Sequence, residues 1–384
     1  MRNSQKKIMI LGAGQMQVPV IKKCSDLNIF TIAVDFDEYA PGFKYSDKGL
    51  ILSTHDKEEI LKQAKKNKID GILTTSDYPV NSVAFVSNQL GLSGLSQDVA
   101  TLSTNKFLLR EKLKECKLNC PKYIIACDNS ELTQVDFFPA IIKPIDSSAS
   151  RGVKKVNTPE ELYEQFAISR EFSVSQKVIV EEFIHGREYS VEAISQGGKH
   201  YIISITGKTI VGEEDGFFVE LAHQIPANLS EEEIELVHTE TLAALNAIGL
   251  DDSASHAEII LSGKKAYIVE VGARLGGDFI GSDLVPLSCG VDMLEDIVKV
   301  SIGEEISTTK DRMCYSGIHF ITPENYKSAA AFIQEKQDII VKYEINNYQN
   351  KKIENSLDRL GYIIVVTESR KELNDAFRSI NDDN

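Results

Sequence analysis

The sequence predicts an α/β protein whose amino-terminal region is a doubly wound parallel sheet and whose remainder is α+β. Apolar runs at residues 7–11, 30–37 and 71–77 alternate with helical patterns over about the first hundred residues. This alternation is typical of parallel sheets, because a crossover between parallel strands usually contains a helix. From Thr101 onward, strand and helix patterns follow one another in a less regular order. The composition, 42% hydrophobic and 26% charged, suits folded globular domains.

Net charge and hydropathy exclude several classes of function. The 384 residues carry a formal net charge of −15, which argues against general binding to nucleic acids or anionic membranes. No apolar stretch reaches the ~18 residues of a membrane span. The first apolar run leads into a glycine turn and not into a signal-peptide cleavage site. The six cysteines form no CxxC pair and are expected to be reduced thiols. We therefore expect a cytoplasmic protein without nucleic-acid or membrane partners.

A glycine turn follows the first apolar run. Gly12-Ala13-Gly14 matches the start of the dinucleotide-binding fingerprint, and Asp35 stands about twenty residues further on. The third glycine of that fingerprint is replaced by Gln17. Two interpretations stay open, a dinucleotide site and a Rossmann-like scaffold that uses its glycines only for a tight turn. The broken motif favours the scaffold.

The segment "AIIKPIDSSASRGV", residues 140–153, begins as a buried strand and ends in small, hydroxylated residues. Lys143 lies at the end of the apolar run, where a cation is costly unless a negative group meets it. Small residues allow backbone N–H groups to approach an anion, and the hydroxyls of Ser147, Ser148 and Ser150 add donors. The pattern suits a flap over a polyphosphate, and the alternative is an ordinary surface loop.

A second candidate stretch is "VIVEEFIHGREYSVE". The buried run ends in Glu181 and Glu182, which leave a connector whose backbone can read the edge of an adenine. Phe183 and Ile184 supply apolar contacts, and Glu188 on the following strand is within reach of a ribose hydroxyl. The alternative is a charged hairpin without a ligand.

Two acidic residues lie on a predicted hairpin formed by "HAEIIL" and "AYIVEV". Because side chains alternate along a strand, Glu258 and Glu270 share a face only if an odd number of residues forms the loop. Two carboxylates facing each other need a cation, and oxygen ligands beside phosphates suggest Mg²⁺. A purely structural role would instead require a buried Lys or Arg partner. The opposite face is then predicted to hold the apolar residues Ile259, Leu261, Tyr267, Val269 and Val271.

Two further residues are candidates for the substrate side of a site. Arg274 comes four residues after Glu270 and can present a guanidinium fork to a phosphate or carboxylate. His223 lies in the segment 215–230, between a strand and a capped helix, where it can exchange a proton with an incoming group. The alternatives are a surface ion pair for the arginine and a backbone-satisfied histidine.

The order of these features resembles the ATP-grasp superfamily. That order is a first lysine, Lys106, then Lys143 before a small-residue loop, an EEFI connector, and two glutamates followed by an arginine. The resemblance covers essentially the whole chain. It implies a Rossmann-like domain over residues 1–98 and a split ATP-grasp domain over 99–304 with a flexible lid at about 121–184. A small α+β unit follows over 305–384.

The resemblance also implies a ligand for each candidate residue. It assigns the phosphates to Lys106, Lys143, Ser147, Ser148 and Ser150, the adenine to Glu181, Glu182, Phe183 and Ile184, the ribose to Glu188, and Mg²⁺, or Mn²⁺ in its place, to Glu258 and Glu270. The phosphates of ATP would then neutralise Lys143. The family usually has Asn two residues after the second glutamate, and Gly272 stands there. A geometry with two metal ions is therefore in doubt.

Within the superfamily, the chain resembles carboxylate–amine ligases of the L-amino-acid ligase type and the repeat of the carbamoyl-phosphate synthetase large subunit. The resemblance implies an ADP-forming enzyme that joins a small carboxylate, such as an amino acid, to an amine through an acyl phosphate. Lys143, Arg274 and His223 are its expected catalytic residues, and a homodimer is one assembly that it allows. The alternatives are a carbamoyl-phosphate-synthetase-like or purine-biosynthesis-type enzyme, a non-catalytic nucleotide-binding module, and a nicotinamide-dependent oxidoreductase.

Overall fold

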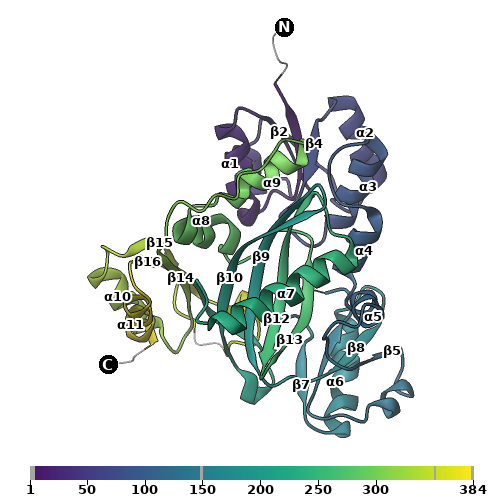
Figure 1. Cartoon of the computed structure of the whole chain (residues 1–384), viewed down its shortest axis with the longest axis vertical. Coiled ribbons are helices and arrows are strands. Elements are labelled where there is room, and N and C mark those ends of the chain that lie inside the picture. Colours follow the sequence, from purple (N-terminus) through teal and green to yellow (C-terminus); the bar gives the residue numbers. More distant parts are fainter. Residues whose placement is uncertain (1–4, 148–149, 350–351, 382–384) are drawn as a thin grey trace.

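The fold is built from three sheets, which Figure 1 shows in a computed structural model of the chain. The structure describes residues 5–147, 150–349 and 352–381. The helices are α1 Val18–Asp26, α2 Lys57–Asn67, α3 Val80–Leu90, α4 Gln97–Thr104, α5 Lys106–Glu115, α6 Pro159–Glu171, α7 Glu231–Ile248, α8 Val285–Cys289, α9 Met293–Ser301, α10 Tyr326–Glu335 and α11 Arg370–Asn381. Within the described ranges, none of these helices has the length and apolarity needed to cross a bilayer.

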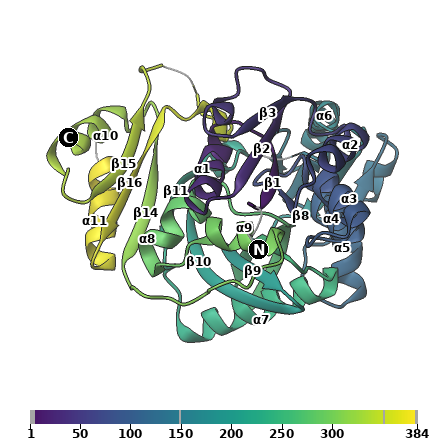
Figure 2. The ribbon, with the colours of Figure 1, turned by 90° about the horizontal axis from the view of Figure 1, so that it is seen from above.

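The amino-terminal sheet confirms the predicted parallel α/β organisation. Its strand order is β3-β2-β1-β4, and all three pairings are parallel. Its strands are β1 Lys7–Leu11, β2 Phe30–Asp35, β3 Lys48–Ile51 and β4 Gly71–Leu73. The sequence did not predict β3, because this edge strand has only four residues and none of them is buried. Helix α1 lies on one side of this sheet, and α2 and α3 lie on the other (Figure 2).

The central sheet has eight strands in the order β13-β12-β9-β10-β11-β14-β16-β15, all antiparallel. The strands are β9 Arg187–Gln196, β10 Lys199–Val211, β11 Val219–Ile225, β12 Ser253–Ser262, β13 Lys265–Gly272, β14 Tyr315–Ile321, β15 Ile340–Ile345 and β16 Gly361–Thr367. Helix α7 packs across β10, β12 and β13, and α11 packs on β14 and β16 (Figure 1). The region after residue 304 therefore extends the central sheet and does not form a sheet of its own.

A third, smaller sheet lies beside the central one. Its strand order is β5-β8-β6-β7, and α6 packs on β6, β7 and β8. The strands are β5 Tyr123–Ala126, β6 Ala140–Pro144, β7 Lys154–Val156 and β8 Val178–Glu182. This unit has its own apolar core and spans most of the range predicted for a lid, whose flexibility stays a prediction. The domain boundaries at 98/99 and 304/305 remain a prediction, because one core joins residues of the amino-terminal sheet, the central sheet and α9.

A helix boundary places the first candidate lysine. The sequence after Thr101 predicts an amphipathic helix with Leu108, Leu109 and Leu113 on its apolar side and Thr104 or Asn105 as its cap. The structure confirms Asn105 as that cap, since its extended backbone (φ −132°, ψ 105°) separates α4 from α5. The Asn105 side chain accepts the N–H of Leu108 at 3.1 Å and so caps α5. Lys106 is consequently the first residue of α5.

Candidate active site

One cavity of about 410 Å³ lies between the small sheet, the central sheet and loops from both ends of the chain. Every predicted site residue except Ser148 lines it, and Ser148 lies outside the described residues. The predicted residues on its wall are Lys106, Lys143, Ser147, Ser150, Glu181, Glu182, Phe183, Ile184, Glu188, His223, Glu258, Glu270 and Arg274. The structure thus brings together residues that are up to 168 positions apart in the sequence.

Lys143 is buried against a carboxylate of the protein itself. Its Nζ lies 2.7 Å from Oε2 of Glu181, and Oε1 of Glu181 lies 2.8 Å from Nε of Arg110. Burial lowers the pKa of Lys143, while the two cations outweigh burial at Glu181 and hold its pKa below the usual range. The expectation that the phosphates alone neutralise Lys143 was therefore wrong. Because Arg110 adds a second cation, the cluster of Arg110, Lys143 and Glu181 keeps a net positive charge beside the cavity.

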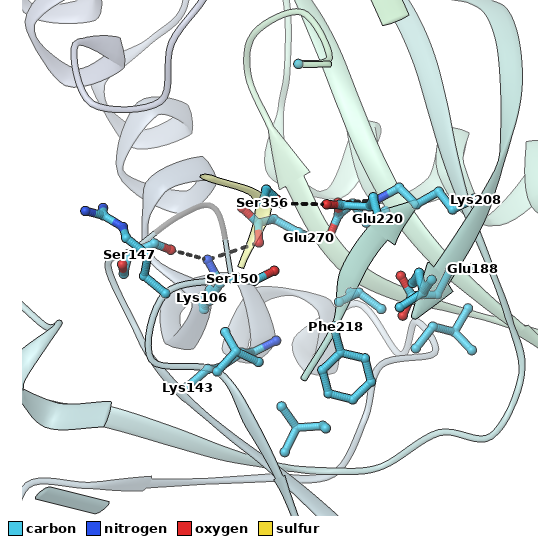
Figure 3. A pocket seen from close by; sticks show the side chains of 18 of the residues that line it. Lys106, Lys143, Ser147, Ser150, Glu188, Lys208, Phe218, Glu220, Glu270 and Ser356 are labelled. Atoms are coloured by element: carbon cyan, nitrogen blue, oxygen red, sulfur yellow. Dashed lines mark hydrogen bonds and ion pairs between the residues drawn. The ribbon is translucent and has the colours of Figure 1, made fainter. Parts of the chain in front are cut away.

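Lys106 joins the loop after β6 to the central sheet. Its Nζ donates to the backbone oxygen of Ser147 at 2.9 Å and lies 3.0 Å from Oε2 of Glu270 (Figure 3). Burial opposes the charge on Lys106, but the Glu270 carboxylate outweighs it and raises the pKa. The ammonium therefore stands charged at the end of the cavity nearest the small-residue loop.

Glu258 has a lysine partner as well. Nζ of Lys208 lies 2.5 Å from Oε1 of Glu258 and 3.6 Å from Oε1 of Glu220, and the Lys208 side chain is 3% exposed. Glu220 also accepts a hydrogen bond from the hydroxyl of Ser356 at 3.0 Å (Figure 3). Burial, with Glu258 and Glu220 nearby, raises the pKa of Glu188 to about 7. Three carboxylates thus surround one lysine, so this wall of the cavity carries an excess of acid.

A buried histidine completes the surroundings of Glu258. His256 Nδ1 lies 2.5 Å from Oε1 of Glu192, and its Nε2 lies 3.7 Å from Oε1 of Glu258. Burial alone would lower the pKa of His256, but the Glu192 carboxylate outweighs burial and raises it to about 9. Glu192 also accepts the N–H of Gly276 at 3.1 Å, and a Cβ on this glycine would approach both Glu192 oxygens to 2.8 Å. Only glycine fits at that position.

The two hairpin glutamates lie directly opposite each other in the pairing of β12 with β13. The turn between the strands has two residues, which by itself would place Glu258 opposite Val269. A β-bulge between the pairs of Glu258 and Ile259 adds the missing residue to β13. The odd count that the sequence argument required therefore comes from the bulge and not from the turn.

The bulge also corrects the predicted apolar face of this hairpin. Tyr267 is only half-buried and Val269 lines the cavity, whereas Ile268 is fully buried in the core beneath the sheet. Three of the predicted residues do lie in that core, and these are Ile259, Leu261 and Val271. The prediction for Tyr267 and Val269 was wrong, because an extra residue inverts the alternation on one side of it.

The residues present fit a divalent cation. Glu258 and Glu270 offer hard carboxylate oxygens from opposed positions, and the acid excess around Lys208 favours an added positive charge. The described part of the chain contains no group of three or more His, Cys, Asp or Glu residues arranged to hold a metal ion without a ligand's help. A metal here would thus depend on oxygens from a bound phosphate and water. The lysine partners that a purely structural role requires are present too. The two carboxylates are therefore stabilised both with and without a metal ion.

The opposite end of the cavity is apolar. The ring of Phe183 lies 6.2 Å from that of Phe218, and Nζ of Lys155 lies 4.0 Å from the Phe183 ring centre. The backbone N–H groups of Glu182 and Phe183 donate to the oxygens of Lys122 and Pro139 at 2.9 and 3.1 Å. Apolar side chains line this end, and they are Ile141, Ile184, Ile210, Ile260 and Val269. A flat aromatic base suits such a surface.

Arg274 is held by a residue of the amino-terminal region. Its Nε and one terminal nitrogen lie 2.6 and 2.8 Å from the two carboxylate oxygens of Asp77. The third nitrogen donates to the backbone oxygen of Leu275 at 2.9 Å. Both side chains line the cavity, so the arginine is neither a free surface group nor an exposed ion pair.

His223 belongs to a buried cluster that includes the carboxyl-terminal region. Its Nε2 lies 3.4 Å from Oδ2 of Asp278, and Asp278 is also held by both terminal nitrogens of Arg359 at 2.8 Å. The guanidinium of Arg359 stacks 3.6 Å from the ring centre of Phe320. Asp278 and Phe279 have positive φ angles of 50° and 62°, a left-handed backbone that residues other than glycine adopt uncommonly.

The sequence analysis missed several charged residues of the site. Among them are Asp77, Arg110, Lys208, Glu220, Asp278 and Arg359. One signal was available for Arg110, which occupies an apolar position of the α5 pattern next to Leu109. The others lie in loops or on polar strand positions, where a charge carries no information without its partner.

The glycine turn after β1 serves the scaffold. The N–H of Ala13 donates to Oδ2 of Asp35 at 2.7 Å, and the N–H of Gly42 donates to the oxygen of Ala13 at 2.7 Å. Gln17 is buried and donates to the hydroxyl of Thr75 at 3.1 Å. The acid that a ribose would need thus binds the protein's own backbone, which supports the scaffold interpretation.

Comparison with known proteins finds one family model and several relatives. Residues 136–283 match the family model described as "ATP-grasp domain". The carbamoyl phosphate synthase large chain of Thermoanaerobacter sp. is 26% identical over 294 residues, which cover 73% of this chain and 26% of that one. This chain thus spans about a quarter of its length. The alanine–anticapsin ligase of Bacillus subtilis is 25% identical over 334 residues, which cover 75% of this chain and 68% of that one.

The fold has close counterparts among solved structures. The L-amino acid ligase of Bacillus licheniformis superposes with a TM-score of 0.84 at 21% identity, covering 99% of this chain and 98% of that one. The predicted combination of an α/β amino-terminal region with later α+β regions is therefore confirmed. The family match identifies an ATP-grasp domain over residues 136–283 of this chain.

Proposed function

We propose that this protein is an ADP-forming ligase that joins a small carboxylate, such as an amino acid, to an amine through an acyl phosphate. The observation that carries the proposal is the cavity on which two lysines, two opposed glutamates and an arginine converge. Lysines suit phosphate oxygens, opposed carboxylates suit a divalent cation, and a guanidinium suits a carboxylate. The names of two similar proteins, alanine–anticapsin ligase and L-amino acid ligase, support the same reaction class.

The nucleotide would lie along the cavity from its apolar end to its charged end. Phe183 and the isoleucines around it offer a surface for adenine, and Glu188 stands on β9 for the ribose. Lys106 and Lys143 then meet the phosphates, together with the hydroxyls of Ser147 and Ser150. Both lysines would exchange a protein carboxylate for phosphate oxygens. Nucleotide binding would therefore replace their ion pairs and leave neither lysine without a negative partner.

The reaction would proceed in two steps. A carboxylate oxygen of the substrate, held by Arg274, attacks the γ-phosphorus; the bond to the β,γ-bridging oxygen breaks and ADP leaves. The amine nitrogen then attacks the acyl carbon, phosphate leaves with the bonding electron pair, and the nitrogen loses a proton. His223, beside Asp278, is placed to accept that proton. The protein contributes position and charge in both steps.

Glu258 and Glu270 would hold Mg²⁺, and Mn²⁺ in its place, which when bound neutralises phosphate charge. Gly272 stands where the family usually has Asn, and a Cβ there would lie in ordinary contact with the Arg274 guanidinium, at 3.5 Å.

The proposal is tested by a matrix of amines and carboxylates in which ADP release is measured with ATP and Mg²⁺. A ligase gives ADP only when both partners are present, and the product mass equals their sum minus water. Lys143→Ala should reduce the rate by about 100-fold or more, because a phosphate contact and its transition-state charge are lost. Lys342→Ala, a lysine outside the cavity that pairs with Asp283, is the matched control.

Two outcomes would contradict the proposal. Nucleotide binding without ADP release for any pair would indicate a non-catalytic module. Release of ADP with bicarbonate and ammonia alone would indicate the carbamoyl-phosphate-synthetase-like alternative. A homodimer belongs to the same proposal, and sedimentation at several concentrations measures it.

A further inference from the structure

Asp77 reaches the cavity from the amino-terminal region, in the loop after β4. Two contacts tie this loop to the sheet behind it: the hydroxyl of Thr74 donates to the oxygen of Leu11 at 2.8 Å, and Gln17 donates to Thr75 at 3.1 Å. Its carboxylate binds Arg274, which lies 197 residues further along the sequence. The aspartate thus belongs to the amino-terminal sheet region, and the arginine that it binds follows strand β13 of the central sheet.

The hydrogen bonds of Arg274 can be counted. A guanidinium carries five N–H groups. Asp77 takes the Nε–H and one N–H of the nearer terminal nitrogen, and the oxygen of Leu275 takes one N–H of the other terminal nitrogen. One N–H on each terminal nitrogen is left without an acceptor within the described residues. The two terminal nitrogens together form the end of the guanidinium fork, which fits the two oxygens of a carboxylate or phosphate.

The pair is fixed by charge and by its surroundings. Burial opposes the ionisation of Asp77, but Arg274 outweighs burial and holds the pKa of Asp77 below its usual range. The side chains are 14% and 27% exposed, for Arg274 and Asp77 respectively, so solvent competes little with the contact. A freely rotating arginine would lose side-chain entropy when it bound a substrate, whereas this one is already held.

We propose that Asp77 is a positioning residue that presents the free end of the Arg274 fork to the oxyanion of the substrate. The inference rests on the proposed function, since that function supplies the carboxylate and the acyl phosphate as ligands. It makes the amino-terminal sheet a part of the substrate site, so that the affinity for the carboxylate depends on a residue outside the ATP-binding strands.

Acetate is the probe, because it carries the carboxylate and nothing else. In ¹⁵N-labelled protein the Arg274 Nε–H signal, assigned with Arg274→Lys, is followed during an acetate titration. Asp77→Asn keeps the size of the side chain and removes its charge. We expect faster exchange of the Nε–H with water and acetate binding weakened at least about tenfold, which corresponds to 1.4 kcal/mol. Asp77→Glu should recover part of the affinity.

The control is Lys23→Met. Nζ of Lys23 lies 2.6 Å from Oδ2 of Asp292, so this substitution also removes an ion pair between α1 and the residue that caps α9, but away from the cavity. If Lys23→Met weakens acetate binding as much as Asp77→Asn does, loss of docking between the regions explains the effect and the inference fails. It also fails if wild-type protein does not bind acetate at Arg274, or if Asp77→Asn binds it as tightly as wild type.

Enzyme kinetics separates this inference from the proposed function. Where the ADP-release matrix identifies a substrate pair, Asp77→Asn should raise KM for the carboxylate about tenfold and leave the Kd of ATP within about twofold. An unchanged KM overturns the inference while the ligase activity stands. If no pair releases ADP, the proposed function fails, and the acetate titration alone decides whether Asp77 positions Arg274.

Discussion

Arg110 and Lys143 bracket the carboxylate of Glu181, and all three side chains are at most 8% exposed. Arg110 also donates to the backbone oxygen of Val269, the bulge residue of β13, at 2.6 Å. A buried ion pair is stabilising only relative to its broken form, because each charge has already lost its water. The triad therefore fixes the position of Lys143 and links α5 to both the small and the central sheet.

Replacing Arg110 should destabilise the fold strongly. In Arg110→Met the Glu181 carboxylate keeps only Lys143 and the Val269 oxygen loses its donor, so the free energy of unfolding should fall by about 3 kcal/mol or more. Urea unfolding measures this change. Arg187→Ala breaks the exposed pair with Glu233 and should cost less than about 1 kcal/mol. Equal losses for the two variants would contradict the structural role of the triad.

Asp296 on α9 predicts a pH dependence of stability. One carboxylate oxygen accepts the N–H of Ser307 at 3.1 Å, the other has no partner among the described residues, and burial raises the pKa of Asp296 to about 6. In the unfolded chain the pKa is near 3.9. Between these values the folded state binds more protons, so this group's contribution to stability falls as pH rises from about 4 to 6.

The neutral variant Asp296→Asn should therefore unfold at a higher temperature than wild type at pH 7.5, by about 2 °C or more, and at the same temperature near pH 4. Calorimetry at the two pH values measures both differences. The exposed Asp375→Asn variant serves as the control and should show no such divergence. A constant offset across pH would show that packing and not ionisation causes the change.

At the scale of elements, the loop between β6 and β7 depends on one glycine. Gly152 has φ +71°, and a Cβ there would lie 2.8 Å from the ring of Phe172 and 3.1 Å from Pro144. The hydroxyl of Ser169 on α6 donates to the Gly152 oxygen at 2.7 Å and fixes the same point. The end of this loop is thereby set by close packing.

Gly152→Ala should therefore weaken ATP binding. Gly197 has a similar φ of +60°, but a Cβ at that position would meet nothing within 4 Å, so Gly197→Ala is a matched control for backbone strain alone. Both substitutions should cost about 1 kcal/mol of stability through the left-handed backbone. Only Gly152→Ala should raise the Kd of ATP, by about tenfold, because the clash shifts the loop. Isothermal titration measures Kd, and equal values for both variants would contradict the prediction.

At the scale of the whole molecule, the cavity is closed by every part of the chain. The loop after β4 supplies Asp77, the small sheet supplies Lys143, the central sheet supplies the two glutamates, and the segment near Ser356 adds Arg359. A ligand in the cavity therefore contacts all these parts at once, and its binding free energy is added to the stability of the folded state.

A non-hydrolysable ATP analogue should accordingly raise the unfolding temperature, and Mg²⁺ should raise it further. In the double variant Glu258→Gln/Glu270→Gln the increment from Mg²⁺ should vanish, while the analogue alone still stabilises the protein through Lys106 and Lys143. Differential scanning fluorimetry with and without EDTA measures both increments. Glu305→Gln, outside the cavity, should leave both unchanged. A persistent Mg²⁺ increment in the double variant would place the metal elsewhere.

The sequence by itself determined the main element types and identified residues that the structure brings together in one cavity. Periodicity identified the parallel sheet, and the order of two lysines, the EEFI connector and two glutamates identified the strands that line the cavity, because these signals are local. It also showed that the glycine fingerprint is incomplete at Gln17.

Only the tertiary structure decided how charges are paired and which face each side chain occupies. The bulge at Val269 sets both glutamates on one face, and Asp77 and Arg359 meet Arg274 and Asp278 across 197 and 81 residues. Glu181 neutralises Lys143 for the same reason. The physical cause is that an ion pair or a strand register depends on two segments that are distant in the sequence. The residues of one segment do not identify its partner.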